Sequence, residues 1–178
     1  ENIISARLNL QGSRFHYNSE FGASLAITNK SDLPLVVCDD GLFAGNIRLD
    51  ARLSGDIEKN IPNLVSKNIC PCSAIEPDRS LIIPLTVFTG QLRQVLSTHP
   101  QASIDIELTV FLDPIVTETG EVTNTLADIK PVKANITRPG IKITTNYLQN
   151  RLNSIAKGKQ GQKIKTAELF AGLLAEQN

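Results

Sequence analysis

The sequence is poor in the residues on which most binding and redox sites depend. Its 178 residues include no tryptophan and no methionine, only 4% aromatic residues, two histidines and three cysteines. Aromatic-lined sugar clefts and base-stacking platforms need more rings than this, so the composition argues against both. Lysine plus arginine equals aspartate plus glutamate at 18 each, so the formal net charge is zero and predicts no nucleic-acid partner.

Long hydrophobic runs are also missing. No apolar stretch approaches the ~18 residues that a membrane-spanning helix needs, so we expect no membrane span. No signal-peptide pattern opens the chain, and without an initiator methionine the first residue is expected to be a processing site or a boundary. The odd cysteine count leaves the redox compartment open. With 41% hydrophobic residues the chain still has enough apolar side chains for a folded core.

Residues 104–112 are the stretch around which we expect the fold to be organised. Isoleucine, leucine and valine alternate there with mostly polar residues, the period of two that is typical of a strand with one buried face. Pro100 and Pro114 flank this strand, where proline is tolerated. We predict that Leu108 and Val110 are buried, and that the strand has partners on both sides and a second layer beneath it.

The rest of the first 145 residues also predicts strands. Alternation or short apolar runs between turn residues place them at 3–10, 24–29, 33–38, 46–53, 80–88 and 129–137, with a further short strand at 141–144. Pro84 predicts an edge position for its strand. Residues 54–79 are expected to form a long irregular connection, 91–97 a short helix, and 117–124 a hairpin-like loop. Seven to eight strands with almost no helix predict an antiparallel β-sandwich of the immunoglobulin-like kind.

The C-terminal residues predict a helical tail. Apolar spacing indicates a helix at 147–156, a flexible linker at 157–163, and a second helix at 164–177 that Thr166 caps. The second helix presents an apolar stripe, with Phe170, Leu173 and Leu174 as candidate interaction residues. We therefore expect two units, a sandwich at 1–145 and a tail at 146–178 that begins a further domain. The tail is expected to contact a protein partner, a neighbouring domain or a second copy of the chain.

Three stretches carry a resemblance to a known group of domains. SLAITNKSDLPLVV, EPDRSLIIPLTV and ASIDIELTVFLD resemble the strand and turn runs of bacterial immunoglobulin-like or fibronectin-like accessory domains. The resemblance covers residues 3–137. It implies a non-catalytic module of a larger protein. The chain has neither the paired cysteines nor the core tryptophan of antibody-type domains, so it is not one of those.

Cys38, Cys70 and Cys72 are the candidate redox or metal residues. Two thiols separated by Pro71 suggest thiol exchange, or a soft metal with Cys38 and His99 as further ligands. A redox pair normally sits at a helix N-terminus, and structural zinc normally takes cysteine pairs spaced by two to four residues. We therefore favour free buried cysteines or a disulfide between Cys38 and Cys70 or Cys72. No bound metal or cofactor is expected.

The remaining titratable residues predict no catalytic centre. Asp32, Asp39, Asp40 and Asp113 are loop carboxylates that suit a calcium site only if their loops converge, and aspartate is common in turns for its own sake. Neither histidine lies near a serine-nucleophile motif, and no glycine-rich phosphate loop is present. We therefore expect no enzyme.

The sequence thus favours a non-catalytic module that acts in protein–protein recognition or as a structural spacer. The alternative is a small-ligand or carbohydrate-binding sandwich that uses loop residues 39–43 and 117–124. The scarcity of aromatic residues argues against this alternative.

Overall fold

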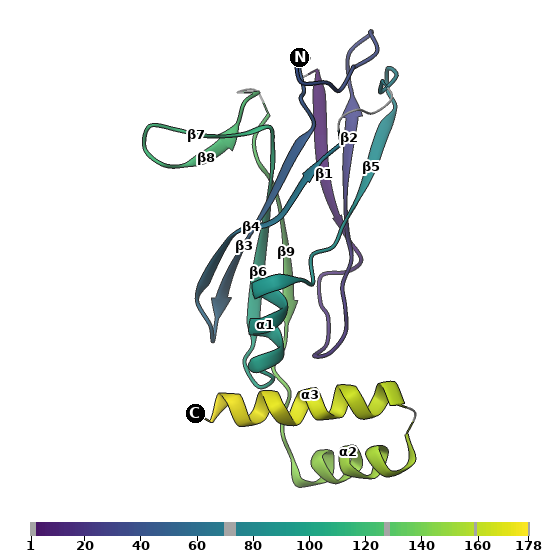
Figure 1. The fold of residues 1–178 in the computed structure, drawn as a ribbon, viewed down its shortest axis with the longest axis vertical. Helices are drawn as coiled ribbons and strands as arrows, with labels where there is room; N and C mark the ends of the chain where they lie inside the picture. The colour runs from purple at the N-terminus through teal and green to yellow at the C-terminus, as the bar shows by residue number, and fades with distance from the viewer. Residues whose placement is uncertain (1–2, 70–73, 127–128, 159, 178) are drawn as a thin grey trace.

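The computed structural model describes residues 3–69, 74–126, 129–158 and 160–177. Two antiparallel sheets face each other, and two helices lie across one end of them (Figure 1). One sheet has the order β1-β2-β5 and consists of β1 (Ile4–Leu10), β2 (Ala23–Asn29) and β5 (Ser80–Leu85). The other has the order β4-β3-β6-β9 and consists of β4 (Lys59–Asn68), β3 (Asn46–Gly55), β6 (Ile104–Leu112) and β9 (Val132–Arg138).

The strand order confirms the predicted fold class. Strands β1, β2 and β5 correspond to strands A, B and E of an immunoglobulin-like sandwich, while β4, β3, β6 and β9 correspond to C′, C, F and G. Pro84 lies on β5, which is an edge strand of its sheet, as predicted. A small ribbon of β7 (Pro114–Val116) and β8 (Val122–Asn124) extends sideways at the end of the sandwich away from the helices (Figure 1).

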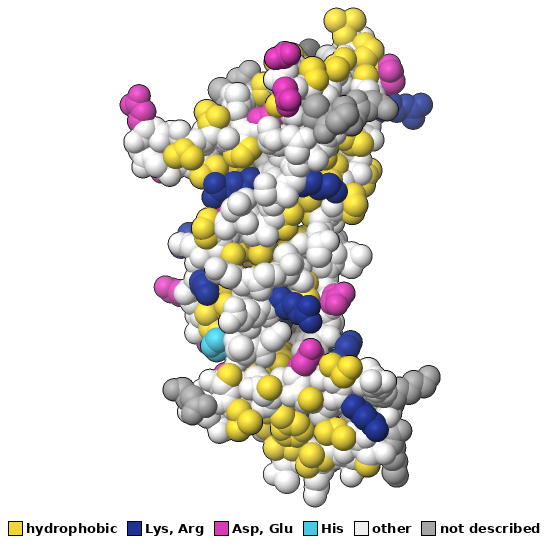
Figure 2. All heavy atoms as spheres, in the orientation of Figure 1, with side chains coloured by type: hydrophobic (Ala, Val, Ile, Leu, Met, Phe, Trp, Pro, Cys, Tyr) yellow, Lys and Arg dark blue, Asp and Glu magenta, His cyan; other side chains and the backbone are white. Residues whose placement is uncertain are grey.

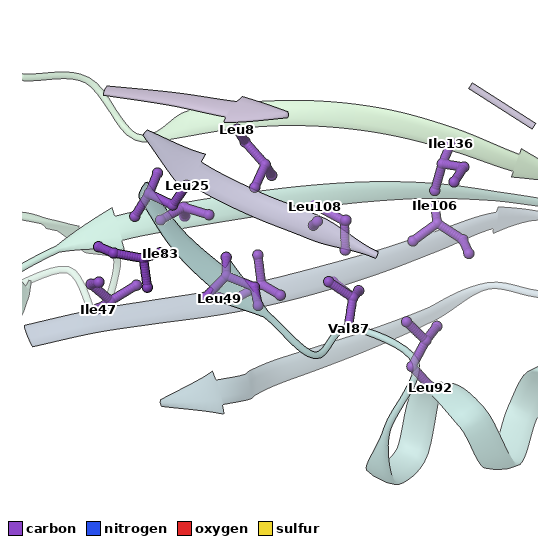
Figure 3. Packing of buried hydrophobic residues seen from close by; sticks show 14 of the residues in the cluster. Leu8, Leu25, Ile47, Leu49, Ile83, Val87, Leu92, Ile106, Leu108 and Ile136 are labelled. Atoms are coloured by element: carbon purple, nitrogen blue, oxygen red, sulfur yellow. The ribbon is translucent and has the colours of Figure 1, made fainter. Parts of the chain in front are cut away.

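The core forms between the two sheets because their strands alternate in polarity. Leu25, Leu49 and Leu108 are fully buried, and Figure 3 shows side chains of both sheets directed into the same layer. Every second residue of β6, from Ile104 to Leu112, is 1% exposed or less. The predicted burial of Leu108 and Val110 is therefore confirmed. Leu108 lies opposite Ala51 of β3 and Ala134 of β9, so it is the centre of the four-stranded sheet.

The prediction of an irregular connection at 54–79 is wrong, because β4 pairs with β3 over ten residues. Its sequence hides the strand, since only Ile61 of β4 is buried and Pro62 interrupts the alternation. The register shifts between Leu49 and Ala51. At this irregularity Asn63 adopts a φ of 53°, and its N–H donates to the Asp50 carboxylate at 2.8 Å. A bulged edge strand of this kind has no regular polarity pattern to detect.

The predicted strands at 33–38 and 141–144 are also wrong. The first segment forms only isolated bridges, between Leu35 and Ile75 and between Val37 and Phe43. Its backbone N–H and carbonyl groups form hydrogen bonds with loop residues rather than with a neighbouring strand, and Val36 is 54% exposed. Residues 141–144 are irregular and lead from β9 into the helices.

In the part of the chain that the structure describes, three helices accompany the sandwich. The predicted helix at 91–97 is confirmed as α1 (Gly90–Thr98), which joins β5 to β6 and buries Leu92, Val95 and Leu96. The predicted helices of the tail are α2 (Thr145–Lys157) and α3 (Gln160–Glu176), which form an antiparallel pair. In Figure 1, α3 lies between α1 and α2, so α2 is the outermost layer.

The predicted linker at 157–163 is wrong, because α3 already begins at Gln160. Thr166 does not cap this helix but lies buried within it, where its hydroxyl donates to the carbonyl oxygen of Gln162 at 2.8 Å. Glycines in a charged, polar segment suggested flexibility, but Gly161 is tolerated in the first turn of α3. The cap of the helical pair is instead at α2, where the Thr144 hydroxyl accepts the N–H of Tyr147.

Candidate interaction surface

The cysteine predictions fall largely outside the described residues, because Cys70 and Cys72 lie in the segment 70–73. Cys38 is half-buried, and its N–H donates to the carbonyl oxygen of Phe43 at 3.2 Å. A disulfide from Cys38 to either of the others therefore stays a prediction. In the part of the chain that the structure describes, no group of three or more His, Cys, Asp or Glu side chains is placed to hold a metal ion.

The other loop residues named from the sequence make local contacts. The Asp113 carboxylate accepts the N–H groups of Ala44 at 2.7 Å and Asn46 at 2.8 Å, so it braces the start of β3. His99 bonds through Nδ1 to the carbonyl oxygen of Val95 at 3.0 Å, at the end of α1. His16 is exposed. None of these contacts forms an acid–base pair that would suit catalysis.

The inner face of α3 packs against the sandwich. Its buried residues are Thr166, Leu169 and Gly172, spaced by three, so one side of the helix faces α1. A Cβ atom at position 172 would lie 2.4 Å from the carbonyl oxygen of Ser97, the close approach that only glycine allows. Because the backbone of α3 approaches the end of α1 this closely, α3 packs directly against the sandwich and is not merely connected to it by the chain.

Polar contacts fix the same helix at three points. The Asn18 amide donates to the carbonyl oxygen of Lys165 at 2.8 Å. The Tyr17 hydroxyl donates to the carbonyl oxygen of Glu168 on α3 at 3.4 Å and to that of Ser97 on α1 at 2.8 Å, beside Gly172. Near the C-terminal end, the Glu176 carboxylate accepts the backbone N–H of Gln101 at 3.0 Å and its side-chain amide at 3.2 Å. These contacts extend along most of α3.

Arg138, the last residue of β9, is buried beneath this joint. Its guanidinium donates to the carbonyl oxygens of His99 at 2.6 Å and Pro100 at 3.0 Å, and it lies 5.8 Å from the Tyr17 ring centroid. Burial lowers the pKa of Arg138. Burial also raises the pKa of Tyr17 to about 12, against the opposing effect of the nearby guanidinium. The two side chains hold the chain where it leaves the sandwich for the helices.

The outer face of the helical pair is apolar and open. Among the described side chains of α2 none is buried. Leu152 of α2 and Ile164 and Leu174 of α3 are each more than half exposed. Of the predicted interaction residues, Leu174 is 65% exposed, while Phe170 and Leu173 are half-buried, each four residues after a buried position of α3. Their role in binding stays a prediction.

Exposed hydrophobic side chains concentrate at the two ends of the molecule. We call residues 139–158 and 160–177 the helical end, and residues 30–45, 74–79 and 113–126 the loop end; Figure 1 places them at opposite ends of the long axis. Among the described residues, the loop end and adjoining Ile3 hold six of the ten exposed large hydrophobic side chains, the helical end holds three, and Ile82 on β5 is the tenth. The loop-end set is Ile3, Leu33, Val36, Leu42, Ile115 and Val116.

The two ends also differ in charge. The helical end contains five basic residues and two acidic ones, Glu168 and Glu176. The loop end contains eight acidic residues and two basic ones. Figure 2 shows acidic side chains over the loop end and hydrophobic ones across the helical end on the face in view. The zero net charge of the whole chain conceals this asymmetry, and only a count of charges by segment shows it.

Comparisons with protein-family models and with curated proteins give no match. Solved structures give weak similarities. The CARDB domain of a Pyrococcus furiosus protein, solved with di-metal ions, is 8% identical with a TM-score of 0.35, covering 78% of this chain and 94% of that one. Bacillus subtilis Spo0M, a sporulation control protein, is 12% identical with a TM-score of 0.35, and the match covers 88% of this chain and 56% of that one.

A β-glucosidase from Listeria innocua, solved with glucose, is 10% identical with a TM-score of 0.36. The match covers 79% of this chain and 17% of the β-glucosidase chain. Similarities of this size support no argument about function, ligand or metal. In the described residues, no helix is long and apolar enough to cross a membrane.

Proposed function

We propose that this chain is a non-catalytic sandwich module that acts in protein–protein recognition, with the outer face of α2 and α3 as its contact surface. The observation that carries the proposal is the state of α2. This helix of 13 residues buries none of its described side chains, although Leu148, Leu152 and Ile155 recur along it at spacings of four and three. Such spacing is typical of a helix with a partner on its apolar side.

Physical chemistry supports a missing partner for α2. Helices shorter than ~12–15 residues are marginal in water, and most helices in proteins are stabilised by packing of one face. In this chain α2 contacts α3 and remains half-exposed along its apolar side. A partner that covers Leu152, together with Ile164 or Leu174 of α3, would remove from water the apolar surface that the sandwich leaves open.

The rest of the structure suits a supporting role. The contacts of α3 with Gln101, Tyr17 and Asn18 hold the helical pair in one orientation on the end of the sandwich. The pKa shifts of Tyr17 and Arg138 arise first from their burial at this joint.

Site-specific photo-crosslinking tests the proposal. A photoreactive amino acid replaces Leu152, which is 54% exposed on α2, and in a matched control it replaces Ile82, which is 57% exposed on β5. In cells that express the chain naturally, we expect discrete protein adducts from position 152 and none from position 82. Equal labelling at both positions, or none at position 152, would contradict a contact surface on the helices.

A further inference from the structure

We propose that the helical end docks on the loop end of a second copy of this chain, so that copies associate head to tail. The inference rests on the proposed function, because it names the partner of the same surface. Both surfaces are open in the described residues. Each combines exposed apolar side chains with an excess of one charge, and the signs are opposite.

Charge complementarity selects this arrangement over a symmetric one. A two-fold contact between helical ends would pair two surfaces that each carry an excess of basic residues, Lys142, Lys163 and Lys165 among them. Like charges that face each other across an interface cost several kcal/mol, whereas opposite patches steer association and fix its register. The acidic residues of the loop end include Asp32, Asp39 and Asp40, and they provide the opposite charge in the head-to-tail arrangement.

The apolar residues of the two ends supply the attraction that charge alone does not. On the loop end, Leu33 is 74% exposed and Leu42 is 50% exposed, and both lie close in sequence to the aspartates. On the helical end, Leu152 and Ile164 are similarly exposed among the basic residues. An apolar centre with a charged rim is the usual anatomy of a protein interface.

The position of the two ends decides what such a contact builds. Since they lie at opposite ends of the long axis, one contact leaves a free helical end on one copy and a free loop end on the other (Figure 1). A heterologous contact that does not close on itself continues into a chain of copies. The sandwich then acts as the spacer between successive contacts.

Charge reversal in the full chain tests the proposal. Variant A carries Lys142→Glu and Lys163→Glu, which removes the basic excess of its helical end. Variant B carries Asp39→Lys and Asp40→Lys, which lowers the acidic excess of its loop end from six charges to two. A control variant carries Arg52→Glu and Lys59→Glu on exposed positions of β3 and β4, outside the residues of both ends. Circular dichroism and thermal melting confirm that each variant is folded.

Sedimentation velocity gives the readout. We expect the unmodified chain and the control to self-associate at low ionic strength and to dissociate at ~1 M salt, where charges are screened beyond about 3 Å. Variants A and B should each self-associate about tenfold more weakly, while an equimolar mixture of A and B should form heterodimers. Tighter self-association of A, or failure of the mixture to form heterodimers, would overturn the head-to-tail contact.

Two further results separate this inference from the proposed function. If the unmodified chain stays monomeric while crosslinks from position 152 reach a different protein, the second-copy partner is wrong and the recognition role stands. Binding of the unmodified chain to vesicles of an anionic phospholipid, lost in variant A and without self-association, would assign the basic face to a membrane surface and overturn the inference.

Discussion

Replacing Leu108 with alanine should lower the free energy of unfolding by ~2–4 kcal/mol, because the change removes buried apolar surface and leaves a cavity. Leu108 is fully buried on the central strand pair of the four-stranded sheet, between Ala51 and Ala134. Because both cross-strand neighbours are alanine, neither can move a long side chain into the space. Denaturant unfolding measures the effect.

The matched control makes the same chemical change on the surface. Leu152 is 54% exposed on α2, and leucine and alanine are both good helix formers, so Leu152→Ala should change stability by less than ~0.5 kcal/mol. If the two variants unfold at the same denaturant concentration, Leu108 does not lie in the core and the register of β6 is wrong.

A second pair of variants should give effects of opposite sign within one helix. Gly172→Ala places a Cβ atom 2.4 Å from the Ser97 carbonyl oxygen and 3.0 Å from the Tyr17 hydroxyl, so α3 must shift away from α1. Overpacking of this kind costs ~1–3 kcal/mol. Gly161→Ala meets no atom within 4 Å, so it should be neutral or stabilising by up to ~1 kcal/mol through helix propensity.

Thermal unfolding of the two glycine variants checks the joint between sandwich and helices. The expected loss at 172 arises only if α3 is held against the end of α1. A stabilising effect at both positions would show that α3 stands away from the sandwich in solution, and the predicted division at residue 145 would then describe two independent units.

Strands with one buried face could be predicted from the sequence, and strands without one could not. Strands β3 and β6 alternate regularly because each buries one side, so both were predicted, together with the burial of Leu108 and Val110. Strand β4 was missed because an edge position leaves its side chains exposed and a bulge at Asn63 breaks the period. Residues 33–38 were predicted as a strand from a short apolar run between turn residues, but hydrogen bonds to Phe43 and Ile75 hold them in loops.

The two helices of the helical end were predicted from the sequence, but their packing against the sandwich was not. Its two helices follow from apolar spacing, and the exposed position of Leu174 agrees with the apolar stripe. The face that packs on the sandwich was not foreseen, because its contacts use Thr166 and Gly172, residues that a hydrophobic pattern ignores. Close approach at Gly172 depends on where α1 ends, which is a property of the tertiary fold. Arg138 was missed because a buried arginine looks like a surface residue in the sequence.

Hydrogen exchange along the isolated chain, in dilute solution, tests the central claim most directly. The account predicts that backbone N–H groups of α3 near Leu169 exchange nearly as slowly as those of β3 and β6, because they unfold together with the sandwich. Backbone N–H groups of α2 around Leu152 should exchange much faster, because this helix contacts α3 and its outer side is exposed in the isolated chain. Fast exchange throughout α3 would show that the helices are not fixed to the sandwich, and slow exchange throughout α2 would show that it needs no partner.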